Sequence, residues 1–262
     1  MAAKGSGVAQ SVIGVGRDAQ RLEQARRCGI IDEGFVDLTA AAKRADLVVF
    51  CTPVDRIVAG VREAAKSCRA GALITDAGSV KDCISRELAA GLPDGVEFVG
   101  SHPLAGSERQ GFQHADALLF LNRVCVLTPL EKSPRQVVER IAEFWKALGA
   151  NVVEMSPTAH DRALAETSHL PHLAAAALAA VLSPENSGLA ASGFRDTTRI
   201  ASGDPDLWTA IFLGNRTQVL ASLTKYDQLL AEFRQAIERN DAPALQKLLV
   251  DAKISRDRNV TQ

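Results

Sequence analysis

The sequence lacks the features that mark a membrane protein, a secreted protein or a nucleic-acid-binding protein. Its longest apolar stretch, around 173–182, is mostly alanine and falls short of the ~18 consecutive apolar residues that a membrane span needs. The N-terminus carries one lysine and no apolar core, so we expect no signal peptide. The 30 basic and 31 acidic groups give a formal net charge of -1, so we expect neither a nucleic acid nor an anionic membrane as a partner.

Paired cysteines, internal repeats and low-complexity linkers are also missing. The cysteines number five, and no two of them have C-x-x-C spacing: Cys28, Cys51, Cys68, Cys83 and Cys125. An odd, unpaired set favours reduced thiols in a cytoplasmic protein and argues against a metal cluster. What remains is a chain of 262 residues, 47% hydrophobic and 23% charged. That length suffices for one large domain or for two of ~100–150 residues each.

The first part of the chain alternates short β-branched runs with helical patterns. Near-continuous apolar strands separated by amphipathic helices predict a parallel sheet covered on both faces, which is a doubly wound α/β fold of the Rossmann type. The expected strands are 11–15, 46–51, 72–75, 97–100, 123–128 and 151–155, and the expected helices are 18–27, 54–66, 80–88 and 134–148.

After Met155 the strand signals stop. Long helical patterns rich in Ala and Leu follow over 160–182, 205–239 and 243–256. We therefore expect two domains, a sheet domain over 1–155 and a helical domain over 156–262. So wide an apolar helical surface is usually buried partly against a second copy, which predicts a homodimer.

A doubly wound sheet suggests a dinucleotide site, whose signature is G-x-G-x-x-G. The run Gly14-Val15-Gly16-Arg17-Asp18-Ala19 matches only superficially, because Asp18 would oppose a pyrophosphate at the helix N-terminus. We interpret 12–16 as the second strand of a mononucleotide unit, whose end faces the adenosine ribose, with Asp18 as a helix cap. Gly16 offers no carboxylate to the ribose and Arg17 adds positive charge, so the turn favours NADP slightly over NAD. An ordinary strand and turn is the alternative.

The densest chemical segment is Ser101-His102-Pro103-Leu104-Ala105-Gly106-Ser107-Glu108, directly after the expected strand 97–100. In an open parallel sheet, ligands bind beyond the carboxyl ends of the strands. Ser79 occupies the same edge one strand earlier. A lone histidine there is more often structural, but His102 beside a hydroxyl is a candidate general base, because imidazole titrates near neutral pH and needs a partner to orient it.

The helical part holds two polar clusters. His169 and His172 lie three residues apart in Ser168-His169-Leu170-Pro171-His172, but no third ligand with suitable spacing follows, so we expect no metal site. The second cluster, 193–200, carries Arg195 and Arg199 in an expected loop. A guanidinium matches a carboxylate bidentately, so this loop would clamp an anionic substrate. Helix caps and surface pairs are the alternative.

Six runs of the sequence form one pattern: Asp76-x-Gly78-Ser79-Val80-Lys81, 101–108, His160-Asp161, 168–172, 193–200 and Asp204-Pro205-x-x-Trp208. Taken together, these runs resemble the prephenate/arogenate dehydrogenase family of tyrosine biosynthesis. The resemblance covers nearly the whole chain, in the family's order. It implies a dinucleotide-binding domain followed by an all-helical dimerisation domain, in agreement with the boundary after residue 155.

The resemblance also implies an activity, the oxidative decarboxylation of prephenate or arogenate. A hydride passes from the ring carbon bearing the hydroxyl to NAD(P)+, the ring carboxylate leaves as carbon dioxide, and aromatisation drives the step. By match to the family, His102 would accept the proton of the ring hydroxyl. Ser79 would hold that hydroxyl and the imidazole in register.

The remaining site assignments rest on the same resemblance. Arg199 would bind a substrate carboxylate, with His172 nearby on the substrate's side and Glu108 as a gating partner of Arg199. Thr52 and Pro53 would lie under the nicotinamide half of the cofactor.

The chain departs from the family at its start. The family begins with a strand and a G-x-G-x-x-G turn before the strand placed at 12–16, whereas 1–10 resembles the tail of the first helix and its loop. Lack of this central strand would leave the sheet split and the pyrophosphate without its helix N-terminus.

Two rival functions remain. A dehydrogenase of the β-hydroxyacid type would want a catalytic lysine in the helical part, where no lysine sits in such a motif. A non-enzymatic dimer module that has lost its cofactor site fits the departure at the start.

Overall fold

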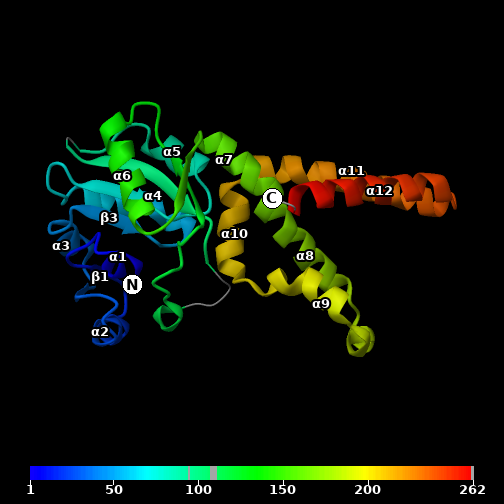
Figure 1. The fold of residues 1–262 in the computed structure, drawn as a ribbon, viewed down its shortest axis with the longest axis horizontal. Helices are drawn as coiled ribbons and strands as arrows, with labels where there is room; N and C mark the ends of the chain where they lie inside the picture. The colour runs from blue at the N-terminus through cyan, green and yellow to red at the C-terminus, as the bar shows by residue number, and fades with distance from the viewer. Residues whose placement is uncertain (94, 107–110, 261–262) are drawn as a thin grey trace. The chain divides into compact units, whose positions relative to one another are not determined.

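The computed structural model describes residues 1–93, 95–106 and 111–260 (Figure 1). By its internal packing the chain divides into two compact units, Met1–Arg216 and Thr217–Gln262. The first unit holds all described strands together with the helices as far as α10 (Pro205–Gly214). The predicted boundary at residue 155 stays a prediction, because α7 to α10 belong to the same packing unit as the sheets.

The main sheet has five strands in the order β3-β4-β5-β6-β7. Their bounds are β3 Leu47–Phe50, β4 Leu73–Asp76, β5 Glu97–Pro103, β6 Val124–Thr128 and β7 Asn151–Glu154. Two neighbouring residues of β4 show how both faces of the sheet are covered. Leu73 packs in the core cluster that holds Trp145 of α6 (Arg135–Ala147), and Ile74 packs in the cluster on α4 (Val54–Ala65) and α5 (Asp82–Leu88). The predicted doubly wound α/β fold is therefore confirmed.

One strand pair differs from the prediction. β3, β4 and the start of β5 are parallel, as are β6 and β7, but β5 and β6 pair antiparallel through residues 100–103 and 125–128. A parallel pair needs a crossover, usually a helix, whereas the described part of the β5–β6 connection contains only the short turn η1 (Phe112–His114). This pairing extends β5 three residues beyond the predicted end. His102 therefore lies inside the strand, and its placement after the strand end was wrong.

A second sheet consists of β1 (Ile13–Val15) and β2 (Glu33–Phe35), which are parallel. The described strands thus form two separate sheets. The sequence did not predict β2, which is short and contains a glycine. The helix between them, α2 (Ala19–Arg27), begins as predicted: Asp18 Oδ1 accepts hydrogen bonds from the backbone N–H groups of Gln20 and Arg21, at 2.8 and 3.2 Å.

The helices that follow the main sheet begin with α7 (Pro157–Leu164), η2 (Ala165–His169) and α8 (Leu170–Val181). They form one helical run, as predicted, but η2 is a π-helical turn. The segment 193–200, predicted as a loop, instead forms α9 (Ser192–Thr198) and the start of η4 (Arg199–Ser202). Its threonines donate hydroxyl hydrogen bonds to carbonyls one turn earlier, so polar side chains that suggested a loop are satisfied within the helix.

The second unit contains most of α11 (Arg216–Glu238) and all of α12 (Ala242–Val260). Asn240, in the turn between them, has a φ of 51°, which asparagine tolerates better than most residues. Large apolar side chains stay exposed on both helices, namely Leu220, Leu229, Leu230, Ile237, Leu249, Val250 and Ile254. None of the helices in the described ranges is long and apolar enough to cross a membrane.

Candidate active site

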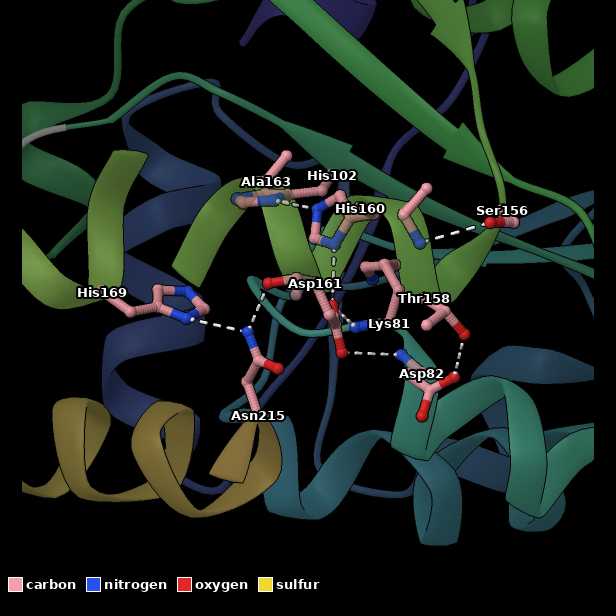
Figure 2. A network of polar contacts seen from close by, with 12 residues as sticks. Lys81, Asp82, His102, Ser156, Thr158, His160, Asp161, Ala163, His169 and Asn215 are labelled. Carbon is pink, nitrogen blue, oxygen red and sulfur yellow. Dashed lines mark hydrogen bonds and ion pairs between the residues drawn. The ribbon is translucent and has the colours of Figure 1, made fainter. Parts of the chain in front are cut away.

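The site is built around His102, whose side chain is 9% exposed. Strand β5 holds its backbone opposite Val126 of β6. The His102 Nδ1 atom lies 2.8 Å from Nε2 of His160, which is fully buried at the start of α7 (Figure 2). The two rings meet edge to face, with centroids 5.1 Å apart. His102 is therefore held by a side chain from another element, as a catalytic imidazole requires.

His160 is itself anchored by its neighbour in sequence. Ser156 caps α7 by accepting a hydrogen bond from the Ala159 N–H at 3.2 Å, and this fixes the first turn of the helix. His160 Nδ1 lies 2.8 Å from Asp161 Oδ1. Asp161 also accepts hydrogen bonds from the backbone N–H groups of Lys81 at 2.8 Å and Asp82 at 3.0 Å (Figure 2). The result is a buried His102–His160–Asp161 chain.

Beneath this chain, a buried ion pair joins Lys81 Nζ to Asp76 Oδ2 at the end of β4. Asp76 also accepts the backbone N–H of Gly78 at 2.9 Å and that of Ser101 at 3.1 Å. A Cβ at Gly78 would lie 2.6 Å from Ile57 Cδ1 and 2.9 Å from Asp76 Oδ2, so a side chain there would displace at least one of these groups. Asp76 thereby ties the loop that carries Ser79 to the strand that carries His102.

Ser79 lies in this loop and is half-buried. The partner that the structure gives His102 is His160, and the Ser79 hydroxyl makes no hydrogen bond to another described residue. It is therefore available to a ligand, and its assignment as the residue that orients the hydroxyl and imidazole stays a prediction.

Asn215, after α10, closes the other side of the network. Its Nδ2 donates to the carbonyl oxygen of Asp161 at 2.7 Å and lies 3.1 Å from His169 Nδ1 (Figure 2). Since that Nδ1 accepts, the neutral His169 ring carries its proton on Nε2. This Nε2 is buried without a hydrogen-bond partner among the described residues. Burial lowers the pKa of His169 to about 4, so the ring is neutral at physiological pH.

The two arginines predicted to clamp an anion differ in their contacts. Arg195 donates from Nη1 to the Ala190 carbonyl at 2.9 Å, so it has a structural partner. Arg199 is exposed and makes no hydrogen bond or ion pair to any described residue. It lies close enough to His172 to lower the pKa of that histidine, and the His172 ring stacks on Trp208 at a centroid distance of 3.6 Å. Glu108, its predicted gating partner, lies outside the described residues.

The basic side chains of the site act on one another in succession. Burial is the main cause of the lowered pKa of His102, followed by the charges of His160, Lys81 and His169. His172 in turn lowers the pKa of His169, and Arg199 lowers that of His172. A neutral imidazole at one end and an exposed guanidinium at the other suit a substrate that offers both a proton and a carboxylate.

The predicted cofactor residues follow two strand ends. Gly16, Arg17 and Asp18 come after β1, while Thr52 and Pro53 come after β3 and lead into α4. Arg17, Thr52 and Pro53 are exposed, and Arg17 has no partner among the described residues. Asp18 is used as a helix cap. These residues fit a nicotinamide dinucleotide, with Arg17 free to meet a phosphate. In the described part of the chain, no group of three or more His, Cys, Asp or Glu side chains is placed to hold a metal ion.

Sequence reasoning gave no role to His160, Asp161 or Asn215. The signal for the first two was present, because adjacent His and Asp residues follow a Ser-Pro helix start in the first turn of α7. Asn215 ends a helix pattern that the sequence reads as continuous over 205–239, so nothing local marks it.

A doubly wound sheet with exposed strand-end loops and a buried, neutral histidine is typical of nicotinamide-dependent dehydrogenases of the Rossmann class. Residues 1–154 match the family described as prephenate dehydrogenase, nucleotide-binding domain, and residues 156–251 match prephenate dehydrogenase, dimerization domain. The chain belongs to the prephenate dehydrogenase family.

Several relatives resemble the chain over most of its length. The prephenate dehydrogenase of Bacillus subtilis is 35% identical over 253 residues, which are 94% of this chain and 68% of that protein. The cyclohexadienyl dehydrogenase of Zymomonas mobilis is 34% identical over 230 residues, 85% of this chain and 78% of that protein. The crystal structure of prephenate dehydrogenase from A. aeolicus with hydroxyphenyl propionate and NAD+ has a TM-score of 0.90 and 30% identity, and covers 98% of this chain and 92% of its own.

Proposed function

We propose that this chain catalyses the oxidative decarboxylation of prephenate or arogenate, with hydride transfer to a nicotinamide cofactor. The products are 4-hydroxyphenylpyruvate or tyrosine, respectively. The observation that carries the proposal is the site itself. His102 is neutral, buried and anchored at Nδ1, and a line of basic groups leads from it to the guanidinium of Arg199, which has no partner among the described residues. Relatives named for these substrates support it.

In this reaction His102 accepts the proton of the ring hydroxyl as the carbon beneath it becomes a carbonyl. The nicotinamide supplies the acceptor for the hydride that leaves this carbon. Loss of the ring carboxylate as carbon dioxide then sends an electron pair through the ring to the carbonyl oxygen. This oxygen takes back the proton that the base had accepted, which gives the aromatic phenol. The chain's contribution is to hold the hydroxyl, receive its proton and fix the carboxylate.

The other proposed roles are those that the resemblance to the family implies. Ser79, whose hydroxyl has no hydrogen-bond partner among the described residues, orients the ring hydroxyl beside His102. Arg199 binds a substrate carboxylate, with His172 beside it, and Glu108 acts as the gating partner of Arg199. Thr52 and Pro53 support the nicotinamide half of the cofactor.

The function is tested by incubating the purified chain with prephenate or arogenate and either cofactor. We expect formation of reduced nicotinamide together with stoichiometric carbon dioxide, and an aromatic product identified by mass spectrometry. Turnover of a simple hydroxyacid without carbon dioxide would favour the β-hydroxyacid dehydrogenase alternative. No turnover and no thermal stabilisation by substrate or cofactor would favour the non-enzymatic dimer module.

We propose that the cofactor pocket prefers NADP over NAD, because Gly16 offers no carboxylate to the ribose and the exposed Arg17 guanidinium has no partner in the described part of the chain. The engagement of Asp18 as a cap removes the carboxylate that would repel a phosphate. Arg17→Ala should lower kcat/KM with NADP by about tenfold, the cost of one charge-assisted contact of ~1.5 kcal/mol, and leave NAD unchanged. Arg140→Ala, an exposed arginine on α6, is the matched control. A clear preference for NAD that Arg17→Ala does not alter would contradict this interpretation.

We further propose that residues 156–262 form a dimerisation domain that pairs two copies of the chain. The match of 156–251 to a dimerization domain supports this, as do the large apolar side chains that α11 and α12 leave exposed.

A further inference from the structure

We propose that His160 and Asp161 are positioning residues that set the protonation state of His102 and share the charge it acquires in the reaction. The inference rests on the proposed function, since it concerns the base of that reaction. The donors and acceptors along the His102–His160–Asp161 chain support it.

Asp161 is 1% exposed. Two backbone N–H groups, from Lys81 and Asp82, point at its two oxygens. A carboxylate can only accept, so the third contact, from His160 Nδ1 to Oδ1, is an N–H donor. Asp161 therefore fixes the His160 proton on Nδ1.

The same logic passes to the next ring. A neutral His160 with its proton on Nδ1 presents a bare lone pair at Nε2, so His102 Nδ1 must donate across the 2.8 Å contact. His102 then carries its own proton on Nδ1 and has the lone pair on Nε2. That is the tautomer which a general base needs, and the substrate hydroxyl meets Nε2.

The negative charge of Asp161 is available to stabilise a proton on His160 or His102. The ammonium of Lys81 is already paired with Asp76, so Asp161 is held by backbone dipoles rather than by a cation. When Nε2 of His102 takes the hydroxyl proton, the proton on Nδ1 moves to Nε2 of His160. One proton enters and one passes on, and the positive charge comes to rest on His160 beside the carboxylate.

This transfer answers a difficulty in the site. Burial lowers the pKa of His102, which keeps the ring neutral but makes it a weak base. A negative charge two rings away stabilises the protonated state without exposing His102 to solvent. The titratable groups that face His102 are Lys81 before α5, Cys125 of β6, His160 of α7 and His169 of η2.

Hydrogen bonds between elements hold the His102–His160–Asp161 chain in place. Thr158 of α7 donates to Asp82 Oδ1 at 2.8 Å, next to the Asp161 contacts with the same loop. Asn215 holds the Asp161 carbonyl from the other side. Asp161 is thus held through both its carboxylate and its backbone carbonyl (Figure 2).

The test compares Asp161→Asn and His160→Ala with the parent chain in steady-state kinetics over pH. For both variants we expect kcat to fall by ~10²- to 10⁴-fold with KM within a few-fold, because the base loses the groups that fix its tautomer. The acid limb of the kcat profile should shift to lower pH in Asp161→Asn, because the protonated base has lost its stabilising charge. Added imidazole should partly restore His160→Ala. It should not affect His114→Ala, an exposed histidine that serves as the control.

A second measurement does not depend on activity or on the folding of a variant. Nitrogen-15 NMR of the histidines in the parent chain should show protonated Nδ1 in both His102 and His160. Protonation of His102 at Nε2 would overturn the proposal, as would near-normal kcat or an unmoved acid limb in a folded Asp161→Asn variant. An inactive parent chain with the expected tautomers would refute the proposed reaction and leave the arrangement of protons standing.

Discussion

Replacing His102 by Asn should lower kcat by ~10²-fold or more, and the KM for the substrate should change little. Asparagine preserves a side-chain amide near His160 but cannot take the proton of the ring hydroxyl. The measurement is steady-state kinetics with both substrate and cofactor varied. His114→Asn, an exposed histidine in η1, is the matched control and should behave like the parent chain.

The same variant gives a check on folding. The pKa of His102 is lowered in the folded state, so unfolding takes up a proton at acid pH. The parent chain therefore keeps the contribution of His102 to stability above the unfolded pKa of about 6.5, and loses it as the pH falls below that value. His102→Asn should be less sensitive to acid. Near-normal turnover in a well-folded variant would remove the assignment of His102 as the base.

Replacing Arg199 by Ala should raise the KM for the substrate by roughly ten- to a hundredfold. The loss of a charge-assisted pair with a carboxylate is worth ~1.5–3 kcal/mol. The KM of Arg199→Lys should fall between those of the parent chain and Arg199→Ala, because lysine keeps the positive charge and loses the bidentate fork.

The neighbouring arginine supplies the control for that experiment. Arg195 donates to the Ala190 carbonyl, so Arg195→Ala should lower the melting temperature and leave KM in place. If Arg199→Ala also lowered only the melting temperature, Arg199 would be a structural residue of η4 and the substrate carboxylate would bind elsewhere.

Local patterns predicted the elements well wherever the determinants are close in sequence. The Asp18 cap, the strands β3, β4, β6 and β7, and the helices on both faces of the sheet follow from caps and apolar periodicity. The prediction of a loop at 193–200 was wrong, because the Thr197 and Thr198 hydroxyls donate hydrogen bonds to backbone carbonyls of α9 itself. The prediction that β6 runs parallel to β5 was wrong, because the direction of this pairing depends on the connection between the two strands and not on the apolar pattern of either strand.

Residues that the sequence placed in the site were those with distinctive chemistry, such as His102 and Arg199. The His102–His160 contact joins residues 58 positions apart, and Asn215 meets Asp161 across 54. No periodicity in the sequence reports such contacts. They arise only when α7 and α10 pack beside the main sheet within the first unit.

The π-helical turn η2 has a consequence for chain length. The Leu170 N–H donates to the Ala165 carbonyl five residues earlier, so this turn takes up one residue more than an α-helical turn. Asp161 and His169 are eight positions apart, about 80° past two turns of a regular α-helix. With one residue absorbed, the eight act as seven, and both residues reach Asn215. A homologous chain one residue shorter in η2 would form an unbroken helix and still present both groups to the same amide. In α7, by contrast, a one-residue insertion or deletion would rotate the side chains that follow it by about 100° and carry His172 away from Trp208.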